Sequence, residues 1–171
     1  MLEGLTVERH RDLVGRRWHV WARRACLGLV AAICVLALVN EFGQRPARTS
    51  AANDRATLEL FAPDRVRGGL LFQARITVIA HKEVKDARLL LDRGWAEGFQ
   101  MNTVEPSPIG EASADGRLSF ELGHVPAGEK YVLWLQFQVN PTNVGHRKQD
   151  IDLYDGDTYL LTRHHDVFVL P

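Results

Sequence analysis

Two short stretches near the C-terminus contain residue types that could hold a metal ion. The first, "DIDLYDGD" at residues 150–157, has four aspartates, and carboxylates are the oxygen ligands that calcium prefers. Large apolar residues stand between these aspartates, however, which an EF-hand loop does not allow. Ile151 and Leu153 alternate with polar residues, as the residues of a half-buried strand do. We therefore expect a β-hairpin that turns at Asp155-Gly156 and has a polar outer face, and no metal site.

The second stretch, "RHHD" at residues 163–166, offers two imidazoles and a carboxylate. Neighbouring residues on a strand point to opposite faces of the sheet, so His164 and His165 cannot readily hold one metal ion together. We expect both histidines at the surface. The sequence also has no G-x-S-x-G elbow, no P-loop and no H-E-x-x-H motif. These observations point away from catalysis, and we expect no cofactor.

Two tryptophans are candidate interface residues. Trp134 belongs to an alternating run in which it shares a face with Val132, opposite Leu133 and Leu135. Trp95 lies in the irregular stretch "DRGWAEGF". Exposed aromatic side chains anchor many protein interfaces and also stack on sugars. A tryptophan covered by a loop would instead be structural, and we favour that alternative for Trp134 because a single aromatic residue does not establish an exposed patch.

The elements that must position these residues begin with an apolar segment. Residues 25–39 run for fifteen residues without a charge, and Trp18, Trp21 and Phe42 extend the stretch at its ends. A helix needs about 20 apolar residues to cross a bilayer, and tryptophans suit the headgroup region. We expect a cytoplasmic tail at residues 1–17 and a transmembrane helix at residues 18–42.

The charges around the apolar segment predict its orientation. Six arginines precede the segment and three follow it closely, namely Arg9, Arg11, Arg16, Arg17, Arg23 and Arg24 against Arg45, Arg48 and Arg55. Because positive residues stay in the cytoplasm, the C-terminal part is expected outside the cell membrane. A cleaved signal peptide has similar features, but the nearest patch of small residues, Thr49–Ala52, lies well beyond the apolar core. We favour an uncleaved anchor, with the signal peptide as the alternative.

Small residues within the predicted helix could contact another membrane helix. Ala25, Gly28 and Ala32 recur at spacings of three and four, which places them on one face. The alternative interpretation is that these small residues face lipid and contact no other helix. Cys26 and Cys34 are too far apart on one helix to form a disulfide with each other, and we expect both to act as small apolar residues.

The remainder of the chain reads as a short linker and an all-β domain. Residues 43–55 are rich in small and turn-forming types, which predicts a linker. From residue 56 to 171, short runs alternate between apolar and polar residues, and no amphipathic helix separates them. Phe72, Ala74, Ile76 and Val78 show the pattern, since they share one face of a strand. We expect an antiparallel immunoglobulin-like β-sandwich of about seven strands.

Three segments carry a resemblance to a known family: "FQARITVIAHKEVKDARLLLD", "EPSP" and "DGRLSFELGHVPAGEKYVLWLQFQVNP". Together they resemble the immunoglobulin-like repeat domain of unknown function found in bacterial surface and secreted proteins. The matching positions are Gly116, Leu118, Phe120, Leu122, Gly123, Ala127, Gly128 and Pro141. The resemblance covers roughly residues 57–171, and the sequence departs from it at Ala80-His81, where such domains often have an asparagine. It implies a structural or adhesive module and no catalytic residues.

The charge composition argues against nucleic-acid binding. Lys and Arg total 21, and Asp and Glu also total 21, so no net positive charge attracts nucleic acid. We expect a non-catalytic, single-pass membrane protein whose outer domain binds or braces a protein partner, as an accessory subunit of a membrane assembly. One alternative is a module that binds carbohydrate or an envelope polymer. Another is a hydrolase whose active site has none of the catalytic motifs named above.

Overall fold

The computed structural model describes residues 17–41 and 43–171, and it divides into two compact units at Phe42 and Gly43. The expected tail at residues 1–17 therefore lies almost entirely outside the described residues. The first unit contains helix α1, Arg17–Leu38. Its segment Trp18–Leu38 is 21 residues long, has a mean hydropathy of 1.8 and buries none of its residues. A helix of this length rises about 31 Å, which matches a hydrocarbon core of about 30 Å. A signal sequence has the same properties.

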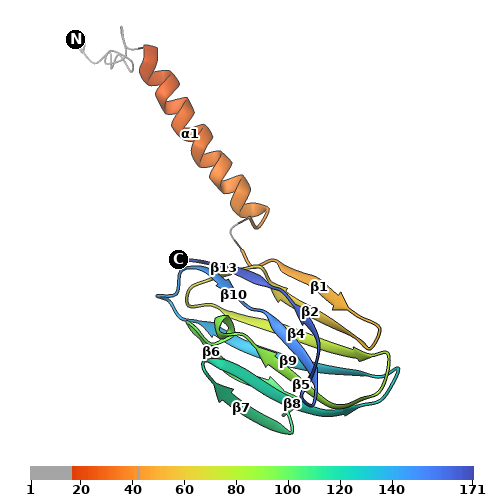
Figure 1. Cartoon of the computed structure of the whole chain (residues 1–171). Helices are drawn as coiled ribbons and strands as arrows, with labels where there is room; N and C mark the ends of the chain where they lie inside the picture. Colours follow the sequence, from red (N-terminus) through yellow and green to blue (C-terminus); the bar gives the residue numbers. More distant parts are fainter. Residues whose placement is uncertain (1–16, 42) are drawn as a thin grey trace, which may run out of the picture. The chain divides into compact units, whose positions relative to one another are not determined.

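The second unit is built from β-strands in three sheets (Figure 1). Sheet 1 contains, in spatial order, β1 (Pro46–Ala52), β2 (Ala56–Pro63), β4 (Leu71–Ala80), β9 (Lys130–Val139) and β6 (Phe99–Glu105). Sheet 2 contains β12 (Thr158–Arg163), β11 (Ile151–Asp155), β5 (Val84–Leu91), β8 (Arg117–Val125) and β7 (Gly110–Ala114). The small sheet 3 contains β10 (Gly145–Lys148), β13 (Asp166–Leu170) and β3 (Arg65–Arg67), of which β13 and β3 are parallel.

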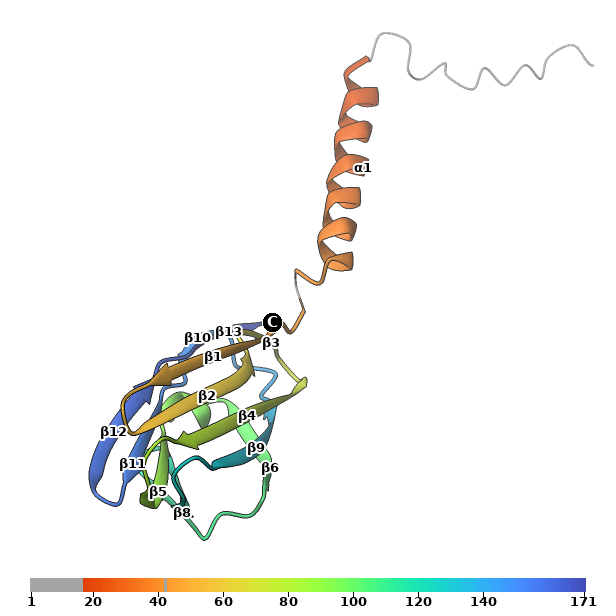
Figure 2. The same ribbon diagram turned by 90° about the vertical axis from the view of Figure 1, so that its right-hand side faces the viewer.

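Sheets 1 and 2 pack face to face around one hydrophobic core. Figure 2 shows β1, β2, β4 and β9 in one layer and β12, β11, β5 and β8 in the other. Alternate residues are buried along most of β2, β4 and β9, as the alternating pattern predicted, and the buried residues of sheets 1 and 2 form one hydrophobic cluster. Its largest members are Trp95, Phe120 and Phe137, each at most 1% exposed. The mostly antiparallel β-sandwich expected from the sequence is confirmed.

The expected linker is partly a strand, which corrects the boundary at residue 56. Strand β1 pairs with β2 along its whole length, from Pro46 with Pro63 to Ala52 with Thr57. Its sequence, "PARTSAA", has no large apolar residue, so the alternation that marks a strand is missing. Strands β3, β7 and β10 were also not expected, because they are short and mostly exposed. Together with β1, they make up four of the six strands by which the thirteen in the described residues exceed the seven expected.

The turn before β8 has the Asp-Gly sequence that is typical of two-residue hairpin loops. Ala114 pairs with Arg117, which leaves Asp115 and Gly116 as a two-residue hairpin loop. Both loop residues have positive φ, 53° and 75°, the conformation that an Asp-Gly pair adopts in a type I′ turn. The turn fixes the register of β7 against β8.

Candidate binding face

The outer face of sheet 1 carries a row of large side chains that crosses all five strands. The register pairs Arg48 with Phe61, and Phe61 with Arg75. It then pairs Arg75 with Trp134, and Trp134 with Glu105. Residues opposite one another on neighbouring strands share a face and lie roughly 5 Å apart. We call these five residues the cation–aromatic row.

Arg75 is the centre of this row. Its guanidinium carbon lies 5.2 Å from the centre of the Phe61 ring and 5.1 Å from the centre of the Trp134 ring. Both distances fall within the range of cation–π attraction. Within residues 17–41 and 43–171, no acceptor receives a hydrogen bond from this guanidinium and no carboxylate forms an ion pair with it. Arg75 is thus held between two rings while its N–H donors stay available.

Three shallow hollows surround the row, and Trp134 lines all of them. The first, of about 190 Å³, is mainly apolar and is lined by Gln44, Pro46, Phe61, Pro63, Gln73, Arg75 and Trp134. The second, of about 450 Å³, contains the cations Arg48, Arg75 and Lys130 together with Glu59. The third, of about 510 Å³, lies between Glu105, Pro106 and Trp134. The face therefore offers apolar and charged contacts next to one another.

The two tryptophans singled out by sequence have different surroundings. Trp134 is half-buried on the outer face, opposite the buried Leu133 and Leu135, as the alternation indicates. Trp95 is fully buried, and its ring packs against Phe137 and His165 at centroid distances of 5.4 and 6.3 Å. A short 3₁₀ turn, η2 (Arg93–Trp95), directs this ring into the core. This placement corrects the expectation that Trp95 could belong to an interface.

The four aspartates of residues 150–157 each have a different protein partner. They lie in and around the hairpin of β11 and β12, which pair in antiparallel fashion. Asp150 accepts from His164, Asp152 from Thr162 and Asp155 from Arg55, while Asp157 lies 3.8 Å from Arg88. In the described part of the chain, no three His, Cys, Asp or Glu side chains form a group that could hold a metal ion. These carboxylates tie strands together.

Asp155 makes the most extensive of these contacts. Its carboxylate accepts hydrogen bonds from the backbone N–H groups of Lys85 and Asp86, at 3.0 and 3.1 Å. It also forms an ion pair with Arg55 at 2.6 Å. Burial alone would raise the pKa of Asp155, but the hydrogen bonds and the Arg55 charge outweigh it and hold the pKa below its ordinary value of 3.8. Asp155 thereby fixes β5 against the turn of the β11–β12 hairpin.

The two adjacent histidines also differ, because alternation sends their side chains in opposite directions. His164 is exposed, as expected, with its Nδ1 atom 3.0 Å from a carboxylate oxygen of Asp150. His165 is only 8% exposed, which corrects its expected surface position. Burial lowers the pKa of His165 below its ordinary value of 6.5, since the charged imidazole loses its hydration. His165 is therefore a core histidine held in its neutral form.

In helix α1, the small residues Ala25, Gly28 and Ala32 are exposed on the described helix. No atom lies within 4 Å of the position that a side chain on Gly28 would occupy. Cys26 and Cys34 are free and exposed on the same helix. The contact of this strip with another membrane helix stays a prediction.

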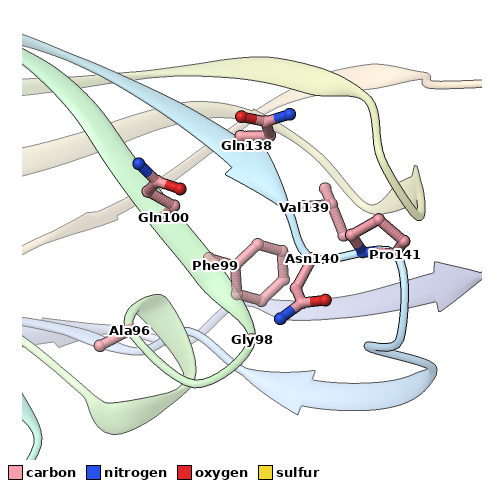
Figure 3. Close-up of a pocket in the computed structure, with 8 residues that line it drawn as sticks. All are labelled: Ala96, Gly98, Phe99, Gln100, Gln138, Val139, Asn140 and Pro141. Atoms are coloured by element: carbon pink, nitrogen blue, oxygen red, sulfur yellow. The ribbon is translucent and has the colours of Figure 1, made fainter.

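A further pocket lies where β9 ends and β6 begins (Figure 3). It has a volume of about 450 Å³, and Gln100 and Gln138 pair across the two strands beside it. Figure 3 shows these two amides on neighbouring strands, with Asn140 and Pro141 at the end of β9. Phe99, its aromatic residue, is only 8% exposed. The pocket therefore offers neutral hydrogen-bonding groups and little aromatic surface.

Sequence reasoning identified Trp134 but missed Phe61 and Arg75. Both residues occupy polar-face positions of their strands, where an isolated aromatic or arginine is ordinary. A signal exists in the pairing register, since β2, β4 and β9 bring the three residues into one row. Register between strands far apart in sequence depends on tertiary packing, which composition and alternation do not reveal.

No family model matches the chain, and no curated protein matches it. Solved structures with some similarity include the sporulation control protein Spo0M from Bacillus subtilis, at 17% identity and a TM-score of 0.41, covering 68% of this chain and 50% of that one. The CARDB domain of PF1109 from Pyrococcus furiosus has 16% identity, a TM-score of 0.39 and coverage of 70% and 98%. CaCohA2 from Clostridium acetobutylicum has 13% identity, a TM-score of 0.43 and coverage of 62% and 85%.

Proposed function

We propose that this chain is a non-catalytic, single-pass membrane protein whose immunoglobulin-like sandwich lies outside the cell membrane and binds a protein partner. In this proposal the partner docks on the outer face of sheet 1, and the protein serves as an accessory subunit of a membrane assembly. The observation that carries the proposal is the cation–aromatic row, because Trp and Arg are the side chains most enriched at the energetic centres of protein interfaces.

The uncleaved anchor is supported by the position of β1. The patch of small residues nearest to the apolar segment, Thr49–Ala52, belongs to this strand and pairs with β2. Cleavage there would remove most of a strand that forms seven register pairs. A folded domain that retains β1 is more consistent with a membrane-spanning α1. The excess of arginines before the apolar segment at residues 25–39 supports a cytoplasmic N-terminus.

The test is site-specific photo-crosslinking in the native host with the full chain. One variant carries a photoreactive residue at Gln73, which is exposed on the outer face of sheet 1 beside the row. A matched variant carries it at Ser119, on the outer face of sheet 2. We expect a discrete protein adduct from Gln73 and none from Ser119. Adducts of equal yield from both positions, or from neither, would refute the proposal.

The second candidate is a module for carbohydrate or an envelope polymer, favoured by the amide-lined pocket of Figure 3. Gln100 and Gln138 have the donor and acceptor groups that match sugar hydroxyls. In that case soluble cell-wall fragments would bind the full chain, and a Gln100→Ala, Gln138→Ala double variant would lose the binding. No change of binding in the double variant would exclude this pocket.

A further inference from the structure

The chemistry of the cation–aromatic row indicates what kind of group it binds. The Phe61 and Trp134 rings flank the Arg75 guanidinium, so partner groups can approach its free N–H donors. A guanidinium presents these donors as a planar fork, which fits the two oxygens of a carboxylate or of a phosphate. Because Arg75 is half-buried between rings, its charge is less screened by water than that of a fully exposed arginine.

The neighbouring charges distinguish between the possible sources of such an anion. Arg48 and Lys130 extend the positive charge on the side of the second hollow. Glu59 and Glu105 lie on the same face, and neither forms an ion pair within the described residues. A bilayer of anionic lipid or a polyanionic polymer would bring negative groups against both glutamates. A protein segment can place one carboxylate on Arg75 and keep acidic groups away from Glu59 and Glu105.

The first hollow specifies a second contact next to the anion. Pro46, Phe61 and Pro63 line it together with Trp134, and its volume is about 190 Å³. That is room for one apolar side chain rather than for an extended ligand. Apolar burial beside a charge-assisted hydrogen bond is the usual composition of an interface centre.

We propose, on the basis of the function proposed above, that the partner is a protein segment that places a carboxylate on Arg75 and an adjacent apolar side chain in the hollow of Pro46, Phe61 and Pro63. The carboxylate comes from an aspartate, a glutamate or a C-terminus. Arg75 supplies the positive charge and a planar pair of N–H donors, and the flanking aromatic rings hold its guanidinium in place. Glu59 and Glu105 select against partners of uniform negative charge.

The test uses the Gln73 photo-crosslink of the full chain in native membranes. Arg75→Gln is expected to lower the adduct yield roughly tenfold or more, since it removes a charge-assisted contact. Arg75→Lys keeps the charge but loses the planar fork, and we expect an intermediate loss. Arg88→Gln is the matched control, because Arg88 lies 5.2 Å from the Tyr154 ring on sheet 2, and it should leave the yield unchanged. The melting temperature of each variant shows whether it folds.

The adduct itself supplies a second readout. Sequencing of the cross-linked partner peptide is expected to find an acidic residue or a C-terminus within a few residues of the attachment point. The yield should also fall as NaCl rises from about 50 to about 500 mM. An adduct that persists in folded Arg75→Gln, a peptide without a carboxylate, or a lipid adduct would overturn this inference. The first two outcomes would leave the proposed function standing, whereas no adduct at all would refute the function itself.

Discussion

At the scale of single residues, Asp155 is expected to stabilise the domain through its charge. Asp155→Asn weakens hydrogen bonds to two backbone N–H groups and removes the ion pair with Arg55. We expect the free energy of unfolding at pH 7 to fall by about 1–2 kcal/mol. Chemical denaturation of both proteins measures this difference. Asp157→Asn is the control, since that carboxylate is fully exposed, and it should have no comparable effect.

The pH dependence of this effect follows from the lowered pKa of Asp155. Because the folded pKa lies below the ordinary value of 3.8, the stabilisation is complete above that pH. It is lost as the pH falls through the folded pKa. The difference between wild type and Asp155→Asn should therefore shrink in acid, and a difference that stays constant from pH 7 to pH 2 would contradict the assigned role.

The lowered pKa of His165 predicts that the stability of the domain also depends on pH in a second, higher pH range. Its pKa is lowered from 6.5, mainly by burial and also by the charge of Arg163, while a hydrogen bond to Pro63 and the charges of Asp166 and Asp64 oppose the shift. At pH values between the folded pKa and 6.5, His165 therefore binds a proton in the unfolded chain but not in the folded chain. Stability should fall below pH 6.5, by at most about 1.4 kcal/mol per pH unit.

His165→Leu should flatten this dependence between pH 7 and pH 5, because leucine binds no proton. The midpoint of thermal unfolding at several pH values measures the slope. His164→Gln serves as the control, since His164 is exposed, and it should retain the wild-type slope. Equal slopes for wild type and His165→Leu would show that another group causes the dependence.

At the scale of elements, β1 should be required for a stable domain. A fragment that starts at Gly43 keeps β1, whereas one that starts at Ala51 lacks most of it and exposes the edge of β2. We expect the longer fragment to give a β-rich circular dichroism spectrum and cooperative unfolding. The shorter one should melt at lower temperature or aggregate. Equal melting temperatures would show that β1 contributes nothing.

The sequence predicted most of this fold but only part of the candidate face. Alternation was sufficient where one face of a strand is buried, as in β4 with Phe72 and Ile76. It failed for β1, whose small residues show no contrast between faces. It also failed for Trp95, because the 3₁₀ turn that directs the ring inwards breaks the strand period. The row around Arg75 required the register of three strands, which local pattern does not determine.

Helix α1 offers a test of the strip formed by Ala25, Gly28 and Ala32. Gly28→Leu keeps the segment apolar, so insertion into the membrane should be unchanged. If another helix packs on the strip, the larger side chain should weaken that association. Native gel migration after mild detergent extraction measures it, with Val30→Leu as a control on the opposite face of the helix. Identical migration of wild type and Gly28→Leu as a monomer would exclude packing through Gly28.

At the scale of the whole molecule, the proposal has three parts. Helix α1 anchors the protein in the membrane, the β-sandwich lies outside the cell membrane, and a partner covers the outer face of sheet 1. The anchor is inferred from the length and apolarity of α1. The location is inferred from the arginines that precede the apolar segment at residues 25–39. The partner on the outer face of sheet 1 is inferred from Arg75, which lies between the Phe61 and Trp134 rings. A protein held near a membrane by one helix meets its partner at a high effective concentration, so even a small contact face can be used.

Cysteine labelling tests this combination most directly. In the full chain with Cys26 and Cys34 replaced by alanine, a single cysteine is placed at Gln73 or at Ser119. Spheroplasts are treated with a membrane-impermeant maleimide before and after a high-salt wash. We predict that Ser119→Cys is labelled before the wash and that Gln73→Cys is labelled only after it. Equal labelling before the wash would contradict an occupied face, and no labelling until the membrane is disrupted would contradict the location outside the cell membrane.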